Sequence, residues 1–305
     1  MVILCSMMFI TWLIQCLLIL LSVAFFTLFE RKVMGLFHLR FGPNKVSFIG
    51  LAQPLLDAFK LLTKQSLVPL RSNKFIYHAS PITALLLAMF VWLTMPMYYM
   101  VVSMNYSLVM FFCLGSMMVF SVLMSGWSSN SKYSLIGSLR SVAQSISYES
   151  VFSTLIVMFM LMAFSYSIRS FTSQSSLLFL FLFPIWVICT LAETHRAPFD
   201  FSEAESELVS GFNTEYSGAY FAFLFLSEYA MLLYSCMLIS YIFFMFFMPF
   251  SFFLLVCCTL AISFLFIWIR ITFCRFRYDM LMMMSWKVLL PLTLCLFVMI
   301  IPIIL

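Results

Sequence analysis

The stretch ILCSMMFITWLIQCLLILLSVAFFTLF, residues 3–29, contains no charged side chain and is long enough to cross a lipid bilayer as a helix. A helix is favoured in lipid because it satisfies its own backbone hydrogen bonds. The stretch has no basic leading segment and no small-residue cleavage site, so we interpret it as a first membrane span and not as a removable signal. It predicts a helical membrane protein.

The rest of the chain has the same character. Of its 305 residues, 65% are hydrophobic and 9% are charged, whereas a soluble protein carries about 25% charged residues. Hydropathy therefore predicts an all-α membrane protein, a single polytopic transmembrane domain over residues 1–305 with eight transmembrane helices. The predicted spans are 3–29, 80–102, 106–125, 142–165, 176–193, 217–241, 249–270 and 283–304.

Basic residues gather on one side of this layout. The loops on that side contain or adjoin all of the 16 Lys and Arg residues except Arg169. Because basic residues favour the inner side of a membrane, we expect these loops to face the mitochondrial matrix, or the cytoplasm of a bacterium, and both termini to face the other way. The loops are 30–79, 126–141, 194–216 and 271–282.

One polar segment on that side has a helical pattern. In LAQPLLDAFKLLTKQS, residues 51–66, the polar side chains recur at helical spacing along one stripe and leucines face away. Pro54 suits a first helical turn. We predict a matrix-side amphipathic helix in the membrane interface, which acts either as an anchor or as a wall of an opening between the bilayer and the protein interior.

Three carboxylates belong to predicted spans. Glu149 and Glu228 lie roughly 12–18 Å deep by residue count, and Glu193 closes the fifth span. Acids at such depth face protein or water and often serve proton pathways, although each one alone could simply hydrogen-bond a neighbouring helix.

Six of the 11 acidic residues lie in the loop ETHRAPFDFSEAESELVSGFNTEY, residues 193–216, between the fifth and sixth spans. Glu203 and Glu207 would share a face and repel each other if this stretch is helical. Such crowding at a membrane costs free energy, which favours a functional use over a simple solvated acidic face.

Other kinds of site are excluded by what the chain lacks. It has nine cysteines but no CxxC pair, and its three histidines are not at ligand spacing, so we expect no metal site. It has no GxGxxG and no cysteine cluster, so we expect it to bind neither NADH, flavin nor iron–sulfur.

The acidic loop resembles the signature of the chain 1 family of NADH-ubiquinone oxidoreductase, the respiratory complex I. Three further segments agree with that family in order: FERKVMGLFHLRFGPNKV with AQPLLDAFKLLTK (residues 29–46 and 52–64), SKYSLIGSLRSVAQSISYE (131–149) and FIWIRITFCRFRYDMLMMMSWK (266–287). The resemblance covers the whole chain. This chain departs from the family pattern at His195, where Asn is usual, and we expect that histidine to place a group that titrates near pH 6.5 beside the quinone chamber that the resemblance implies.

The resemblance implies a quinone chamber and a proton path. It places along the quinone tunnel Arg31, Arg40, Asp57, Phe59 and Lys60. It places in the chamber loop Arg196, Asp200, Glu203, Glu205, Glu207 and Phe212. It places on the proton path Glu149, Glu193, Glu215 and Glu228, and at the docking site of the peripheral arm Arg275, Arg277 and Asp279.

The resemblance also implies partners. Ubiquinone would be the substrate, with no covalently bound group, and FMN and iron–sulfur clusters would belong to partner subunits, including the subunit with the last iron–sulfur cluster. We expect the chain to contact membrane lipids and other subunits, and no nucleic acid. The richness in Phe (38) and Met (25) with only 8 Gly favours a mitochondrial genome, hence the inner membrane with termini in the intermembrane space.

Two other classes fit many-span topology. A secondary transporter or cation/proton antiporter would also carry buried acids, although such proteins commonly contain inverted repeats, and none is evident here. A purely structural assembly subunit is the weaker alternative.

Overall fold

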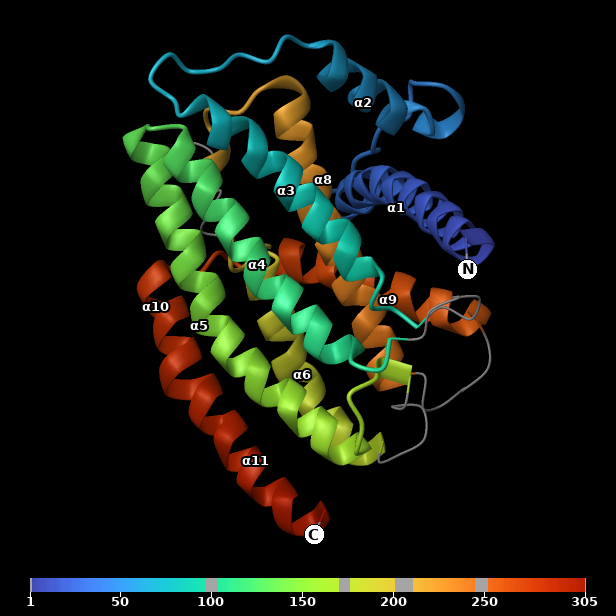
Figure 1. The fold of residues 1–305 in the computed structure, drawn as a ribbon, viewed down its shortest axis with the longest axis vertical. Helices are drawn as coiled ribbons and strands as arrows, with labels where there is room; N and C mark the ends of the chain where they lie inside the picture. Colours follow the sequence, from blue (N-terminus) through green and yellow to red (C-terminus); the bar gives the residue numbers. More distant parts are fainter. Residues whose placement is uncertain (1, 97–103, 170–175, 201–210, 245–251, 305) are drawn as a thin grey trace.

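All regular structure in the described residues is helical (Figure 1). The computed structural model describes residues 2–96, 104–169, 176–200, 211–244 and 252–304, and for these the predicted all-α class is confirmed. A π-helical turn at Ser240–Phe244 extends the helix that ends at Ile239. A second one at Met284–Leu289 joins the helix that ends at Met283 to the helix that begins at Leu290. The helices are α1 Val2–Phe37, α2 Gln53–Thr63, α3 Lys74–Trp92, α4 Ser107–Ser128, α5 Lys132–Ala163, α6 Ser176–Glu193, α8 Gly218–Ile239, α9 Phe252–Thr272, α10 Tyr278–Met283 and α11 Leu290–Ile304.

Seven helical segments in the described part of the chain are long and apolar enough to cross a membrane. The predicted span 176–193 is not among these seven. It corresponds to α6, whose apolar stretch Phe181–Glu193 is shorter than the other seven segments. The count of eight spans is therefore not confirmed, and the eighth remains a prediction.

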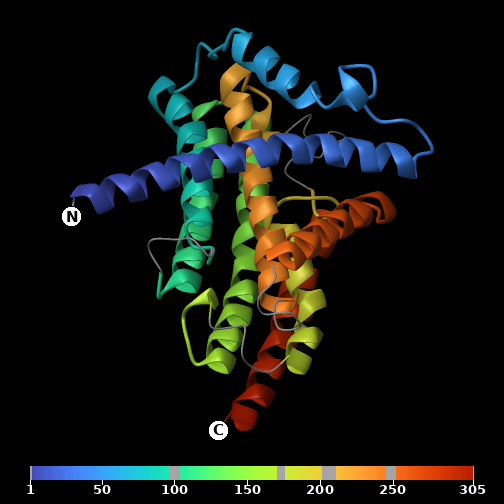
Figure 2. The ribbon, with the colours of Figure 1, turned by 90° about the vertical axis from the view of Figure 1, so that its right-hand side faces the viewer.

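Two predicted loops are shorter than expected because helices extend into them. α1 continues through Phe37 and not only to residue 29, and it crosses the other helices at a steep angle (Figure 2). Its buried positions Val23, Phe26, Glu30 and Val33 recur every three or four residues, so one helical face stays covered beyond the apolar run. α5 likewise begins at Lys132, within the predicted loop 126–141.

The central helices pack closely because small side chains lie between them. A β-carbon on Gly126 of α4 would lie 2.1 Å from Oγ of Ser138 on α5, so only glycine permits this approach. Serines buried along α5 donate hydrogen bonds to their own helix, as Ser141 does to the carbonyl of Ser138 at 2.8 Å. Small residues allow membrane helices to approach closely without leaving polar groups unsatisfied.

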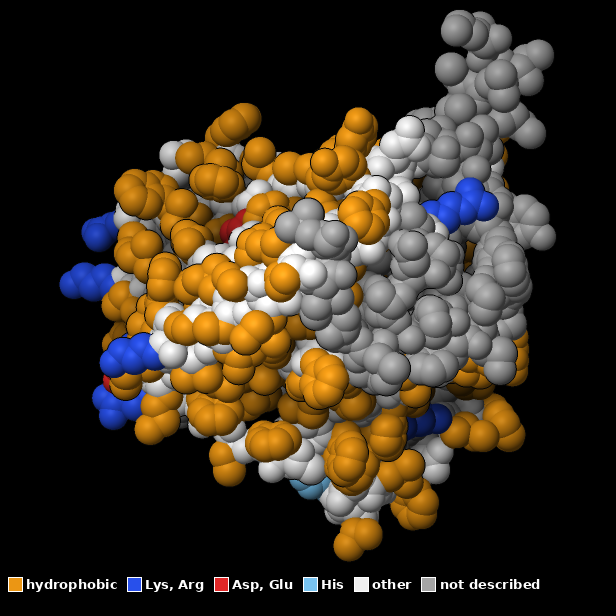
Figure 3. All heavy atoms as spheres, turned by 90° about the horizontal axis from the view of Figure 1, so that it is seen from below, with side chains coloured by type: hydrophobic (Ala, Val, Ile, Leu, Met, Phe, Trp, Pro, Cys, Tyr) orange, Lys and Arg blue, Asp and Glu red, His pale blue; other side chains and the backbone are white. Residues whose placement is uncertain are grey.

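Polar connections gather at one end of the molecule. α2, the turn between α4 and α5 and the start of α8 lie together at the top of Figure 1. Asn73 donates its backbone N–H to the carbonyl of Ser128 at 2.9 Å, and the amide of Asn130 donates to the carbonyl of Arg71 at 3.1 Å. Seen from the opposite end, the described surface is mostly apolar, with Lys and Arg near its edge (Figure 3). The side of the membrane that each end faces remains a prediction.

The segment expected to be amphipathic forms a shorter helix than the predicted range 51–66. α2 covers Gln53–Thr63, with Pro54 in its first turn. Leu55, Phe59 and Leu62 are exposed in the isolated chain. A location in the membrane interface would cover these side chains, and it too remains a prediction.

Candidate functional site

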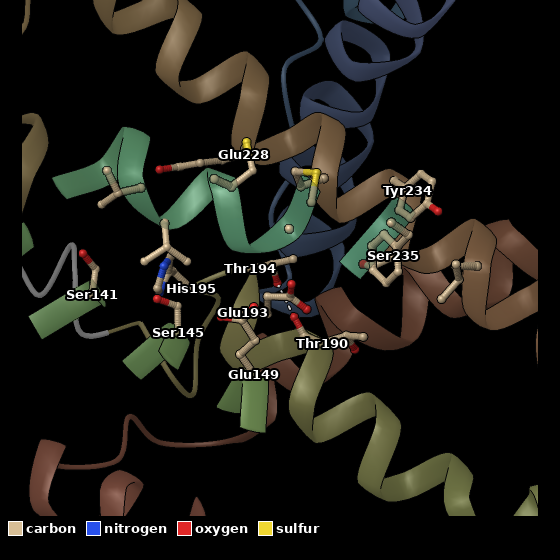
Figure 4. A pocket seen from close by; sticks show the side chains of 17 residues that line it. Ser141, Ser145, Glu149, Thr190, Glu193, Thr194, His195, Glu228, Tyr234 and Ser235 are labelled. Carbon is tan, nitrogen blue, oxygen red and sulfur yellow. Dashed lines mark hydrogen bonds between the residues drawn. The ribbon is translucent and has the colours of Figure 1, made fainter. Parts of the chain in front are cut away.

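A small internal cavity brings together the three carboxylates of the predicted spans (Figure 4). Glu149 of α5, Glu193 at the end of α6 and Glu228 of α8 all line it, and we call it the acid cavity. Its volume of about 80 Å³ has room for several water molecules, since one water needs roughly 15 Å³ of such space. The other lining residues are Phe111, Gly115, Met118, Val119, Val122, Ser141, Ser145, Thr190, Thr194, His195, Met231, Tyr234, Ser235 and Leu238.

Helical spacing explains why these groups meet. Ser141, Ser145 and Glu149 follow each other at four-residue intervals, so they form one polar stripe along α5. Opposite, Gly115 of α4 leaves room for an acid: a β-carbon there would lie 3.4 Å from Oε1 of Glu193. The residues that line this wall of α4 carry no titratable group.

Neither Glu149 nor Glu193 forms an ion pair within the part of the chain that the structure describes. Carboxyl groups that share a small space in a membrane interact strongly, because water screens them little. A proton that binds one of them changes the affinity of the others, so the set titrates as a unit. Carboxyl groups arranged in this way are chemically able to bind and exchange protons.

His195 lies at the end of this cavity, in the turn that follows α6. Its Nδ1 atom is buried and has no hydrogen-bond partner among the described residues. Burial lowers the pKa of His195 to about 4, because the charged imidazolium loses its hydration. The expectation that this group titrates near pH 6.5 is therefore wrong, and the imidazole is neutral at physiological pH.

A second polar site joins four separate parts of the chain around Glu30. The carboxylate of Glu30 is 3% exposed and lies 3.3 Å from Nη1 of Arg196, and it also pairs with Arg270. Tyr229 donates its hydroxyl to Oε2 of Glu30 at 2.9 Å. The Arg196 guanidinium stacks 4.1 Å from the centre of the Tyr229 ring. We call these four residues the Glu30 cluster.

The Glu30 cluster keeps Arg196 charged. Burial by itself would lower the pKa of Arg196, but Tyr229 and the Glu30 carboxylate outweigh it and raise that pKa. The cluster holds two cations against one carboxylate, so it is net positive. The family resemblance places Arg196 in the chamber loop, but the sequence gives Glu30 no role, because the predicted first span ends at residue 29. The helical spacing could have indicated its position, since Glu30 lies on the same face of the helix as the buried residues Val23 and Phe26.

The leading flank of the acidic loop is tied to α5 and to the segment after α9. The Gln144 amide donates to the carbonyls of Ala192 at 2.9 Å and Phe199 at 2.8 Å. Asp200 lies 3.7 Å from Arg275. One glutamine side chain thus holds both the residue before Glu193 and the start of the loop.

The trailing flank is tied to the polar end of the bundle. Gly137 of α5 touches the backbone of Gly211, where an added β-carbon would lie 2.8 Å away. Tyr216 stacks on Tyr77 with ring centres 4.3 Å apart, and burial raises its pKa. Tyr77 donates its hydroxyl to the carbonyl of Glu215 at 2.7 Å. The predicted loop acids between these flanks, Glu203, Glu205 and Glu207, lie outside the described residues.

Among the five predicted tunnel residues, the structure shows one direct contact, and their role in a tunnel stays a prediction. Arg31 pairs with Asp57 at 2.7 Å, and both side chains are more than a third exposed. Arg40, Phe59 and Lys60 are exposed. Only the Arg31–Asp57 pair therefore joins two of the five.

The remaining predicted residues are scattered. Phe212 is fully buried beside Tyr77 and Tyr216, and Glu215 is absent from the lining of the acid cavity. Arg277 and Asp279 pair at 3.2 Å on the surface. No group of three or more His, Cys, Asp or Glu side chains in the described residues could hold a metal ion.

Comparison with known proteins identifies relatives along almost the entire chain. The sequence model of the family described as NADH dehydrogenase matches residues 10–301. NADH-ubiquinone oxidoreductase chain 1 of Anopheles gambiae is 46% identical over 288 residues, which cover 90% of this chain and 89% of the relative. The proteins of the same name from Heterololigo bleekeri and Balaenoptera physalus are 44% and 46% identical, and in both pairs 91% of each chain is covered.

Proposed function

The chain belongs to the NADH dehydrogenase family, and we propose that it is the chain 1 membrane subunit of respiratory complex I, which couples ubiquinone reduction to proton translocation. In this role it is part of an NADH:ubiquinone reductase and is not catalytic alone. The observation that carries the proposal is the acid cavity, in which Glu149, Glu193 and Glu228 share one small space among membrane helices.

The location follows from the same assignment. We propose a multi-pass protein of the mitochondrial inner membrane with eight spans, with its polar end in the matrix and both termini in the intermembrane space. Other complex I subunits would cover much of its surface, and the subunit with the last iron–sulfur cluster would dock near Arg275, Arg277 and Asp279. FMN and iron–sulfur clusters in the partner subunits would supply the electrons.

The chemistry needs a route for charge. Reducing a quinone to a quinol takes two electrons and two protons, and partial reduction creates negative charge where the dielectric constant is low. Carboxylates near that charge are driven towards protonation. We propose that the chamber lies beside the acidic loop and that Glu203, Glu205 and Glu207 respond first.

The anchored flanks supply a connection from the loop to the membrane acids. Gln144 holds the carbonyls of Ala192 and Phe199, so a shift of the loop at Phe199 is passed to the residue next to Glu193. The stripe Ser141, Ser145 and Glu149 starts at the same level of α5. Protons would then move among Glu193, Glu228 and Glu149 through water in the cavity.

The test is neutral replacement of the cavity acids in the assembled complex, reconstituted in sealed vesicles. We expect Glu193→Gln and Glu149→Gln to lower both proton pumping and coupled NADH:ubiquinone reduction, by about 100-fold if proton transfer becomes limiting. Glu193→Asp, which keeps a carboxyl group, is the matched control and should retain a substantial part of the rate.

Normal pumping and normal quinone reduction in both glutamine variants would overturn the proposed function. The purified preparation also separates this function from that of a transporter. A complex I subunit co-purifies with a flavin- and iron–sulfur-containing NADH oxidase, whereas an antiporter would exchange cations for protons as an isolated chain.

A further inference from the structure

His195 is an unused titratable group at the acid cavity. It lines the same space as Glu149, Glu193 and Glu228, and its buried Nδ1 atom has no hydrogen-bond partner among the described residues. A histidine that serves only to support structure normally satisfies its buried nitrogen, because an unpaired buried polar atom costs about 1–3 kcal/mol. The ring therefore has a nitrogen without a partner in the described part of the chain, in a space that three carboxyl groups also line.

His195 lies towards one end of the row of residues that line the cavity. Ser141 and Ser145 precede Glu149 along α5, and His195 follows Glu193 at the end of α6. In Figure 4, His195 and Ser145 lie towards the Ser141 end, Glu193 and Glu149 are in the middle, and Tyr234 is at the far end. The imidazole thus lies on the Ser141 side of the acids and comes from the turn that leads from α6 towards residues 201–210, so we call this end of the cavity its loop end.

The backbone at this position is unusual for the residue it carries. His195 has a φ of 51°, in the left-handed region, where glycine or asparagine is favoured and other residues cost roughly 1–2 kcal/mol. Directly before it, Thr194 donates its hydroxyl to the carbonyl of Thr190 at 2.8 Å. Directly after it, Arg196 donates its backbone N–H to the carbonyl of Leu191 at 3.1 Å. This compact turn sets the direction of the His195 side chain.

We propose that the imidazole of His195 is a proton-relay group that carries protons between the loop end of the acid cavity and its carboxylates. The proposal deepens the proposed function and rests on it. A neutral imidazole has one N–H donor and one bare acceptor nitrogen, so it can accept and release protons at different atoms.

The step balances in protons without any redox change. A protonated water at the loop end gives its extra proton to the bare ring nitrogen, so that an O–H bond breaks, a neutral water remains and an N–H bond forms. The N–H bond at the other nitrogen then breaks, and its proton forms an O–H bond on the carboxylate of Glu193. Exchange of the ring back to its first tautomer, or a ring flip, resets the relay.

The groups that line the cavity with the imidazole can stabilise a transient imidazolium cation. Glu149 on α5, Glu193 on α6 and Glu228 on α8 can each stabilise it, and Tyr234 on α8 is the remaining titratable residue of the lining. The nearest cation in sequence, Arg196, is engaged by Glu30. The pKa of about 4 makes the protonated ring rare at pH 7, about one part in 1,000, as suits a relay and not a store.

The experiment is chemical rescue in the assembled complex. His195→Gly suits the left-handed backbone and leaves space for a free imidazole, and His195→Asn suits the same backbone but cannot relay. Since Asn is usual here in the family and water can take over the transfer, we expect both variants to lower coupled turnover several-fold and not to abolish it, with an increased solvent deuterium isotope effect. Free imidazoles should restore His195→Gly, and the rate should vary with the pKa of the added imidazole.

His78 supplies the matched control. Its Nδ1 atom is also buried without a partner among the described residues, but it lies on α3 beside Tyr220 and outside the acid cavity. His78→Ala should therefore show no rescue that depends on the pKa of the imidazole. His195→Asn protects the test in case the glycine variant does not assemble.

Either of two results would overturn the proposed relay by His195. Normal turnover and isotope effect in the assembled His195→Asn complex, or rescue of His195→Gly that ignores the pKa of the imidazole, overturn the relay. If the relay fails while Glu193→Gln still abolishes pumping, the proposed function stands. If Glu193→Gln and Glu149→Gln also pump normally, the proposed function fails first.

Discussion

Glu30 and Glu193 are both carboxylates on apolar helices, Glu30 within α1 and Glu193 at the end of α6, but their surroundings differ. Glu30 lies against Arg196 and Arg270 and accepts a hydrogen bond from Tyr229. Glu193 shares a cavity with two other acids and forms no ion pair within the described residues. A fully paired charge stays in place and joins helices, whereas an unpaired one in a space with room for water can change its protonation state.

The largest expected effect comes from breaking the paired site. Glu30→Gln leaves Arg196 and Arg270 without their countercharge, and loss of one partner of a buried ion pair costs about 3–5 kcal/mol. We expect the thermal stability of the assembled complex to fall accordingly. The double variant Glu30→Gln with Arg270→Gln should lose less than the two single variants added together, because they share one interaction. Normal stability of Glu30→Gln would show that the cluster is not structural.

The next largest effect is a dependence of stability on pH that arises from His195 at the acid cavity. The pKa of His195 falls from an unfolded value near 6.5 to about 4 on folding, so between these values the unfolded chain binds more protons. Stability should therefore fall as the pH is lowered from about 6.5 to 4, by up to about 3 kcal/mol from this group. The measurement is thermal unfolding of wild type and His195→Asn over this range. Equal pH dependence in both would contradict the prediction.

A smaller effect follows from filling the space beside Glu193. Gly115→Val adds methyl groups beyond a β-carbon that already lies 3.4 Å from Oε1 of Glu193. Overpacking of this kind costs about 1–3 kcal/mol and should displace the carboxylate, so coupled turnover should also fall. Gly115→Ala makes only an ordinary contact and is the matched control. Similar turnover in both variants would mean that Glu193 moves freely away from α4.

The smallest effect belongs to an exposed ion pair. Arg31 and Asp57 lie 2.7 Å apart but are each more than a third exposed, so water screens them. Asp57→Asn should lower stability by less than about 1 kcal/mol, and the loss should vanish at high salt. A cost as large as that of Glu30→Gln would show that other parts of the complex bury this pair.

The sequence predicts the acid cavity better than it predicts the Glu30 cluster. Glu149, Glu193 and Glu228 interrupt apolar runs, and residue counts place Glu149 and Glu228 at similar depth, which is where the structure brings the three acids together. Glu30 follows an apolar run and is succeeded by Arg31 and Lys32, so composition assigns it to a loop. Its true setting depends on α1 continuing to Phe37 and on which face of that helix is covered.

His195 illustrates the same limit for a single group. Its sequence neighbours predict a polar loop and an ordinary titration, but the packing of α4, α5, α6 and α8 around the turn half-buries the side chain and fully buries its Nδ1 atom. A pKa depends on the surrounding dielectric and on nearby charges, and both come from segments distant in the chain.

By itself, the sequence determined that this chain forms helices long and apolar enough to cross a membrane, because local hydrophobicity decides whether a segment enters lipid. Only the tertiary structure decided which charges meet. Glu30 finds Arg196 and Arg270 at sequence separations of 166 and 240 residues. Contacts between such distant residues depend on how helices cross and which faces they bury, and no local pattern carries that information.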